Sequence, residues 1–139
     1  MYIRLEPEFS AARRIEQIMV KIKLSVSTSE GKTQNIEVEG DRAQIFLGKQ
    51  VGEELDGTVL GFQGSSLEIT GGSDKDGFPM RRDVHGGIRS MILLRKGVGF
   101  KAIRKGERRR KLIRGNTITE DIVQINLKTK KLDEKKSIV

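Results

Sequence analysis

Arginine and lysine side chains are concentrated in one short segment of this chain, and the chemistry they offer is the binding of anions. Residues 104–116 include seven basic residues and one acidic residue, and the wider segment 81–115 includes 13 basic and two acidic residues. The rest of the 139-residue chain carries 14 basic and 17 acidic residues, so segment 81–115 supplies all of the net charge of +8. Such local excess charge indicates a nucleic-acid partner.

Arginine outnumbers lysine in this basic segment, and its planar guanidinium can grip a phosphate with two parallel hydrogen bonds. The chain has no Trp, one Tyr and five Phe, which argues against a stacking platform for single-stranded nucleic acid. The pattern favours contact with the backbone of a folded nucleic acid. A merely solvated charged face is the alternative. The run is interleaved with the strand-like pairs Leu112-Ile113 and Thr117-Ile118, however, and therefore belongs to the fold.

A glycine-rich segment from Gly71 to Met80 is the second unusual feature. Three glycines within seven residues predict a loop whose backbone turns sharply or approaches another group closely. The segment lacks the Gly-Lys-Ser/Thr ending of a nucleotide-binding P-loop, which disfavours ATP and GTP. Asp74 and Asp76 resemble the start of a calcium loop, but its later ligands and closing Glu are missing. We expect a scaffold loop beside the basic surface, with direct contact to an anion as the alternative.

Catalytic and metal-binding residues are not indicated. His85 is the only histidine and cysteine is absent, so a typical zinc site and disulfides are excluded. A hydrolase triad of His85 with Ser73 and Asp83 has no geometric support, and His-Gly-Gly at 85–87 is better explained as a turn, with an RNA contact as the alternative. An enzyme that acts on RNA through Asp74 or Asp76 and magnesium is the least favoured class.

Short apolar runs predict a mainly β fold. Val20, Ile22, Leu24 and Val26 alternate with polar residues, a turn follows at 29–32, and a returning strand around residues 36–38 completes a hairpin. A short helix is expected to begin near Asp41. Further apolar runs recur about every ten residues between glycines, at 45–47, 58–60, 67–69, 88–94 and 122–127. We therefore expect a small β-barrel of short strands with glycine-rich turns, a basic extended segment and a short C-terminal tail.

The chain is expected to form one domain over residues 19–130. Its barrel body would span 19–103, and the basic segment with the last strand would span 104–130. Residues 1–18 are expected to be an extension with a short amphipathic helix, and 131–139 a solvated tail. No apolar run approaches the ~18 residues that span a bilayer, and the N-terminus lacks a signal-peptide core. A soluble intracellular protein without membrane contact is the plain expectation.

Four motifs together resemble a known family. They are the segment Gly71–Met80, the pair His85-Gly86, the run 105–111 and the run 114–118. In order and spacing they are similar to the archaeal and eukaryotic small-subunit ribosomal protein number six, more closely to its short archaeal form. The resemblance covers roughly residues 19–130. Residues 1–18 depart from the family, whose members begin near Met19, so they are either a lineage-specific extension or the result of an upstream start codon.

The resemblance implies a non-enzymatic structural constituent of the small ribosomal subunit, located in the cytoplasm within the ribosome. Its partners would be small-subunit rRNA and neighbouring ribosomal proteins. No cofactor, metal or small-molecule substrate is expected. A free-standing basic RNA- or DNA-binding factor is the alternative.

The resemblance places 71–80 and 104–116 among the rRNA-facing parts, and charge selects the individual contacts. The side chains expected to bind RNA are Lys75, Arg81, Arg82, His85, Arg89, Lys101, Arg104, Lys105, Arg108, Arg109, Arg110, Lys111, Arg114 and Asn116. Five glycines are expected to shape the backbone for close approach to RNA: Gly71, Gly72, Gly77, Gly86 and Gly115.

Overall fold

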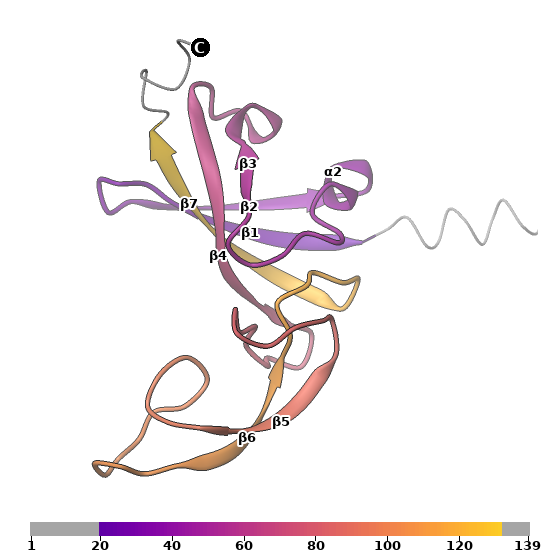
Figure 1. The fold of residues 1–139 in the computed structure, drawn as a ribbon. Helices are drawn as coiled ribbons and strands as arrows, with labels where there is room; N and C mark the ends of the chain where they lie inside the picture. The colour runs from indigo at the N-terminus through magenta and orange to yellow at the C-terminus, as the bar shows by residue number, and fades with distance from the viewer. Residues whose placement is uncertain (1–19, 132–139) are drawn as a thin grey trace, which may run out of the picture.

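The computed structural model describes residues 20–131, which consist mainly of β-strands joined by tight turns (Figure 1). A short α-helix and a short 3-10 helix interrupt the strands. In chain order the elements are β1 (Lys21–Ser27), β2 (Thr33–Glu39), α2 (Asp41–Gln44), β3 (Glu54–Asp56), η1 (Gly57–Leu60), β4 (Ser65–Asp74), β5 (Arg89–Leu94), β6 (Arg109–Arg114) and β7 (Ile122–Lys131).

Five of the strands form one twisted sheet in the order β2-β1-β7-β4-β3. β1 and β7 run parallel, and the other neighbours run antiparallel. The predicted hairpin is confirmed as β1 and β2, with Ile22 and Leu24 buried and Lys21 and Lys23 exposed. The period-two pattern was informative here because only one face of β1 contacts the core.

The mainly β expectation is confirmed, but closure of the sheet into a barrel is not. Within residues 20–131 the sheet has two edges, β2 and β3, with no ladder between them. β3 is only three residues long, and the chain between β2 and β3 includes α2 and irregular turns. That connection leaves no long strand that could join the two edges.

The run 58–60, expected to be a strand, is part of the 3-10 helix η1. Gly57 begins this helix, and its carbonyl accepts a hydrogen bond from the amide of Phe62 at 2.8 Å. A β-carbon on Gly57 would lie 2.5 Å from the carbonyl oxygens of Phe62 and Ser65. A turn this tight leaves no room for extended backbone, which explains why the strand expected at 58–60 does not form.

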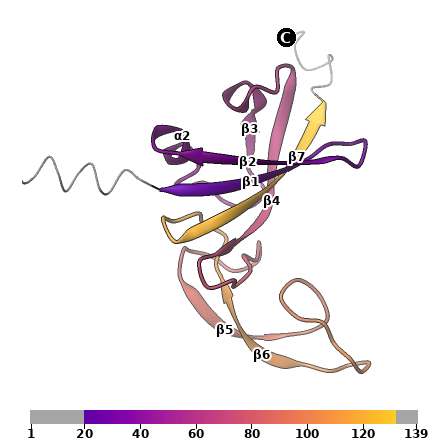
Figure 2. The ribbon, with the colours of Figure 1, turned by 180° about the vertical axis from the view of Figure 1, so that it is seen from behind.

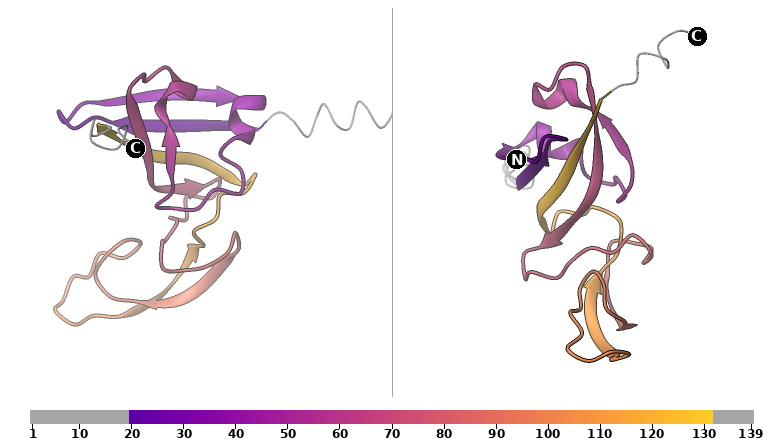
Figure 3. Two further views of the ribbon diagram at one scale, coloured as in Figure 1. Left: turned by 45° about the horizontal axis from the view of Figure 1, so that its top comes forward. Right: turned by 90° about the vertical axis from the view of Figure 1, so that its left-hand side faces the viewer.

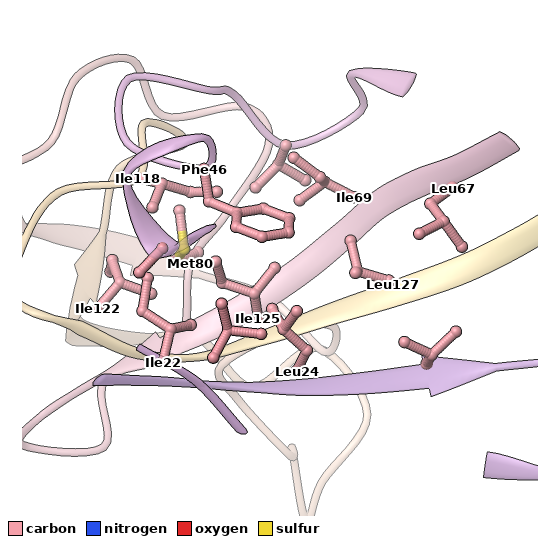
Figure 4. Close-up of a cluster of buried hydrophobic side chains, with 14 residues drawn as sticks. Ile22, Leu24, Phe46, Leu67, Ile69, Met80, Ile118, Ile122, Ile125 and Leu127 are labelled. Atoms are coloured by element: carbon pink, nitrogen blue, oxygen red, sulfur yellow. The ribbon is translucent and has the colours of Figure 1, made fainter. Parts of the chain in front are cut away.

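The apolar core lies against one face of the five-stranded sheet (Figure 4). It is built from alternate residues of β1, β4 and β7, and Phe46, Met80 and Ile118 cover them from outside the sheet. Phe46 follows α2, the short helix expected near Asp41, whose Ala43 is also buried. The opposite face of β1 and β2 is polar and carries ion pairs such as Lys21–Glu39 at 2.9 Å.

β5 and β6 form a separate antiparallel ribbon that extends away from one end of the sheet (Figures 1 and 2). We call residues 89–114, which are this ribbon and the loop that joins its strands, the arm. One face of the arm packs Leu94, Phe100 and Ile113 into a small apolar cluster of its own. Two further views show that the arm meets the sheet only near the end of β4 and the start of β7 (Figure 3).

Two sequence expectations for segments beside the arm need correction. Gly71–Asp74 belong to β4, because they pair with residues 122–126 of β7, so the expected loop 71–80 is shorter than predicted. Thr117 makes only an isolated bridge with Gln50, although the neighbouring Ile118 is buried as an apolar residue should be.

The structure does not describe residues 1–19 and 132–139, so the expected N-terminal extension and almost all of the expected tail lie outside the described residues. Among the described residues, no helix is long and apolar enough to cross a membrane.

Candidate nucleic-acid interface

The arm carries most of the predicted RNA-binding residues on its surface. β6 begins with three exposed cations, and the loop before it adds four more. The exposed side chains are Lys101, Arg104, Lys105, Arg108, Arg109, Arg110 and Lys111. Lys111 lies over the ring of Phe100, 5.3 Å from its centroid, which anchors this cation on the arm's apolar cluster. These seven predicted cations, which lie between residues 101 and 111 of the sequence, are therefore all exposed on the arm.

The loop of the arm is hollowed into a groove of about 560 Å³ with cationic walls. Its cations come from both ends of the loop: Arg95 and Lys96 after β5, and Arg104, Lys105 and Arg108 before β6. Arg95 and Lys96 were not among the predicted site residues, although they lie within the basic segment 81–115. Both residues were included in the count of 13 basic residues in that segment.

Glu107 is the only acidic residue in this groove, and it shapes the loop. Its carboxylate accepts hydrogen bonds from the amides of Ile103 at 3.0 Å and Arg104 at 3.4 Å. These bonds, together with the nearby Arg109 guanidinium at 3.0 Å, hold the pKa of Glu107 below its ordinary value. The acidic charge is thus directed at the loop's own backbone and at β6.

Two predicted RNA-binding residues, Arg114 and Asn116, are buried, each 5% exposed. Arg114 donates to Thr119 Oγ1 at 2.6 Å and lies 3.5 Å from Asp74 and 3.4 Å from Asp121. The side-chain carbonyl of Asn116 accepts a hydrogen bond from the amide of Gly86 at 3.3 Å. Both side chains face the protein interior at the base of the arm.

Asp74, at the end of β4, is the centre of this buried region. Its carboxylate accepts from Arg89 Nε at 2.8 Å and from the amides of Asp76 and Phe78, each at 3.0 Å. Burial alone would raise the pKa of Asp74, but the hydrogen bonds from Phe78, Arg89 and Asp76 outweigh it and hold the pKa below its ordinary value of 3.8. Arg89 also pairs with Asp76 and lies over the Phe78 ring. We call Asp74, Asp76, Arg89, Arg114 and Asp121 the junction cluster.

The remaining predicted side chains come from the chain between β4 and β5. Arg81 forms a two-pronged pair with Asp83, both contacts at 2.8 Å. Lys75 lies 3.6 Å from Asp121. Arg82 and His85 are exposed. The predicted residues therefore separate into an exposed group on the arm and a group at its base that is largely paired or buried.

The predicted backbone-shaping glycines have different structural reasons. A β-carbon on Gly72 would lie 2.4 Å from the Gln124 carbonyl oxygen, and one on Gly115 would lie 2.0 Å from that of Gly86. These close approaches are to the chain's own backbone. Gly77 and Gly86 have positive φ angles of 84° and 97°. Gly71 has neither feature.

No group of three or more potential metal ligands occurs within the part of the chain that the structure describes. The carboxylates of Asp74, Asp76 and Asp121 contact the guanidinium groups of Arg89 and Arg114.

Comparisons with known proteins identify the family that this chain resembles. Residues 21–138 match a family described as ribosomal protein S6e. The small ribosomal subunit protein eS6 of Nitrosopumilus maritimus is 47% identical over 110 residues, which cover 79% of this chain and 80% of that protein. The protein of the same name from Methanoculleus marisnigri is 50% identical over 109 residues, 78% of this chain and 83% of the relative. That of Methanocaldococcus jannaschii is 50% identical over 99 residues, 71% and 75% of the two chains.

Proposed function

The chain belongs to the ribosomal protein S6e family, and on that premise we propose that it is a structural constituent of the small ribosomal subunit. The match begins at the first residue of β1 and includes every strand of the sheet and the arm. In this role the protein would lie in the ribosome, contact rRNA and neighbouring ribosomal proteins, and support subunit assembly without catalysing a reaction.

The arm is the part that would bind rRNA, and the distribution of ion pairs supports this. Three lysines of the sheet have acidic partners: Lys21 pairs with Glu39 at 2.9 Å, Lys23 with Glu37 at 4.0 Å, and Lys130 with Glu68 at 2.9 Å. Eight exposed cations of the arm have no acidic partner among residues 20–131; they are Arg95, Lys96, Lys101, Arg104, Lys105, Arg108, Arg110 and Lys111. Their mutual repulsion is unfavourable in the free protein and would be relieved by phosphates.

The junction cluster would hold the arm in position for this contact. Arg114 and Asn116 act in this proposal as positioning residues, because their side chains are buried in the protein. Arg89 has a similar role, since its guanidinium is engaged by Asp74 and Asp76. Arg82, His85 and Lys75 are exposed and would extend the RNA contact at the base of the arm.

Co-sedimentation with small ribosomal subunits tests the proposed function. We expect one copy of the native protein per subunit, retained after a high-salt wash, because many phosphate contacts are reinforced by assembled neighbours. Protein that is present in less than one copy and washes free would instead favour a free-standing RNA-binding factor.

A further inference from the structure

A second groove, of about 570 Å³, lies where the arm meets the sheet. Gly71, Thr70 and Asn126 line it from the sheet, and Pro79, Arg82 and Val98 line it from the chain that leads into the arm and from the arm itself. We infer that this groove holds an unpaired nucleotide of the rRNA. The inference rests on the proposed function and specifies a site separate from the cationic loop of the arm.

Gly71 is the observation that first points to an external occupant. Ten of the chain's 16 glycines have a positive φ angle, which explains them by backbone conformation. Of the other six, Gly57, Gly72, Gly87 and Gly115 would each bring a β-carbon within 2.5 Å of another atom, and Gly97 meets a single atom at 4.0 Å. A β-carbon on Gly71 would meet nothing within 4 Å.

Glycine inside a strand weakens it, and it often marks a place where a ligand approaches the backbone closely. Nothing within the described chain requires glycine at position 71 by steric conflict or by a positive φ angle. The missing side chain leaves the floor of the groove open. An occupant from outside the chain would account for it.

The strand register shows which way this floor faces. Gly72 pairs with Ile125, whose side chain is in the core, whereas Gly71 pairs with Asn126, whose side chain is exposed. The register shift between Ile69 and Gly71 places Thr70 in a bulge beside them. Gly71 therefore faces the outer side of the sheet, opposite the core, and opens directly into the groove.

The polar groups of the groove match the edge of a base. Gln124 Nε2 donates to Asn126 Oδ1 at 3.1 Å, so the amide nitrogen of Asn126 is left to donate. Thr70 Oγ1 donates to the carbonyl of Asn126 at 3.1 Å, which leaves its own oxygen as an acceptor. Sequence-selective RNA contacts are made mainly to unpaired bases whose edges offer such donors and acceptors.

The rest of the groove suits the base plane and its phosphate. Val98 is 60% exposed and, with Pro79, offers an apolar wall. Arg82 is an exposed cation, whereas the charge of Arg81 is offset by Asp83 at 2.8 Å. The groove is thus less cationic than the arm's loop and more apolar, as expected for one nucleotide and not for a run of phosphates.

Gly71→Val tests the inference, because it adds a side chain at a position that lines the groove and where a β-carbon would meet no atom within 4 Å. Ser66→Val is the matched control, since Ser66 lies on β4 outside the groove. The probe is full-length small-subunit rRNA from the source cells, with chemical probing of base edges and 2′-hydroxyls. We expect Gly71→Val to weaken binding about tenfold and to abolish protection of an unpaired nucleotide, as loss of one base contact does. Ser66→Val should bind like the wild type.

A second variant and a salt titration separate this site from the arm. Asn126→Leu removes the donor while keeping a similar volume, and it should expose the same nucleotide to the probing reagents. Neither variant removes a cation, so the slope of log affinity against log salt should stay at the wild-type value.

Wild-type affinity and an unchanged probing pattern for Gly71→Val would overturn the inference. So would a photoreactive residue at position 71 that crosslinks to a ribosomal protein in reconstituted subunits. A wild-type protein with no rRNA affinity would instead overturn the proposed function.

Discussion

At the scale of single residues, the largest difference between sequence and structure concerns charged side chains that are not on the surface. Asp74 has no exposed side-chain area, and Arg114 is buried beside it. An unpaired buried charge is unfavourable by several kcal/mol, so each of the two depends on the other and on the surrounding hydrogen bonds. In the sequence, Arg114 is one more cation of a basic run, whereas in the structure it connects the arm to the sheet.

Asp74→Asn should destabilise the protein by about 3 kcal/mol at neutral pH, because it removes the buried carboxylate that Arg89 and Arg114 share and leaves them only the half-exposed Asp76 and Asp121. Chemical denaturation measures the loss. Asp76→Asn is the control, since Asp76 is 51% exposed and its pair with Arg89 is weak in water. Equal losses for the two variants would contradict a special role for the buried carboxylate.

The lowered pKa of Asp74 predicts that the folded protein loses stability in acid. The pKa of Asp74 is lower in the folded state than its ordinary value of 3.8, so its contribution is complete above that value and is lost as pH falls below it. Wild-type stability should therefore decrease between about pH 5 and pH 2 more than that of Asp74→Asn, measured by denaturation at each pH. Parallel pH profiles would show that Asp74 is not the responsible group.

Gly72→Val should destabilise the protein by at least ~2 kcal/mol, because its β-carbon would lie 2.4 Å from the Gln124 carbonyl oxygen and force β4 away from β7. Thermal unfolding measures this loss. Gly71→Val is the control one residue away, where a β-carbon would meet nothing within 4 Å, and it should unfold at the wild-type temperature. A stable Gly72→Val protein would contradict the close approach of the two strands.

At the scale of elements, the arm shows that a continuous apolar run predicts a strand without predicting which of its faces is buried. Residues 88–94 predict a strand but contain too little alternation to show which side is buried. Pairing with β6 decides it: Ser90 and Leu94 pair with Ile113 and Arg109 on the packed side, while Met91 pairs with Leu112 on the other. The arm therefore has one covered and one exposed apolar face.

Two adjacent leucines test this register. Leu94 is 3% exposed and packs in the arm's cluster, whereas Leu93 is 59% exposed. Leu94→Ala should lower stability by ~2–5 kcal/mol and Leu93→Ala by less than ~0.5 kcal/mol. Hydrogen exchange of the β5 and β6 amides measures both, because it reports the local free energy of opening of these strands. The opposite order of effects would show that β5 faces the other way.

At the scale of the whole molecule, the chain separates its charges by element. Glu37, Glu39, Glu54 and Glu68 of the sheet pair with lysines of the sheet, and eight exposed cations without an acidic partner among residues 20–131 lie on the arm. If about six to eight phosphates are engaged, log affinity for rRNA should fall with log salt with a slope near −4 to −7. A flat response would contradict phosphate binding.

Location of the charge, and not its total, should determine that slope. Replacing Lys105, Arg108 and Arg110 with Gln should make the slope less steep by about two to three units, measured by salt titration of rRNA binding. Replacing Lys21, Lys23 and Lys130 with Gln changes the net charge equally but removes cations that already have acidic partners. Equal effects of the two triple variants would show that binding is not confined to the arm.

The sequence by itself determined the features that depend on local pattern. The hairpin of β1 and β2 follows from alternation over residues 20–38, and the basic surface follows from composition, since no core can hold so many like charges. The family motifs, each a short stretch of residues, were also readable without a structure.

Only the tertiary structure decided which residues meet across long sequence distances. Asp74 and Arg114 are 40 positions apart, and Gly72 contacts the backbone of Gln124, so no local pattern could show that these positions are internal. The open sheet was undecidable for the same reason, because closure depends on whether two edges meet. Side chains of identical type, such as Arg108 and Arg114, lie in opposite environments, one exposed and one buried, because burial is a property of the folded chain and charge a property of the residue.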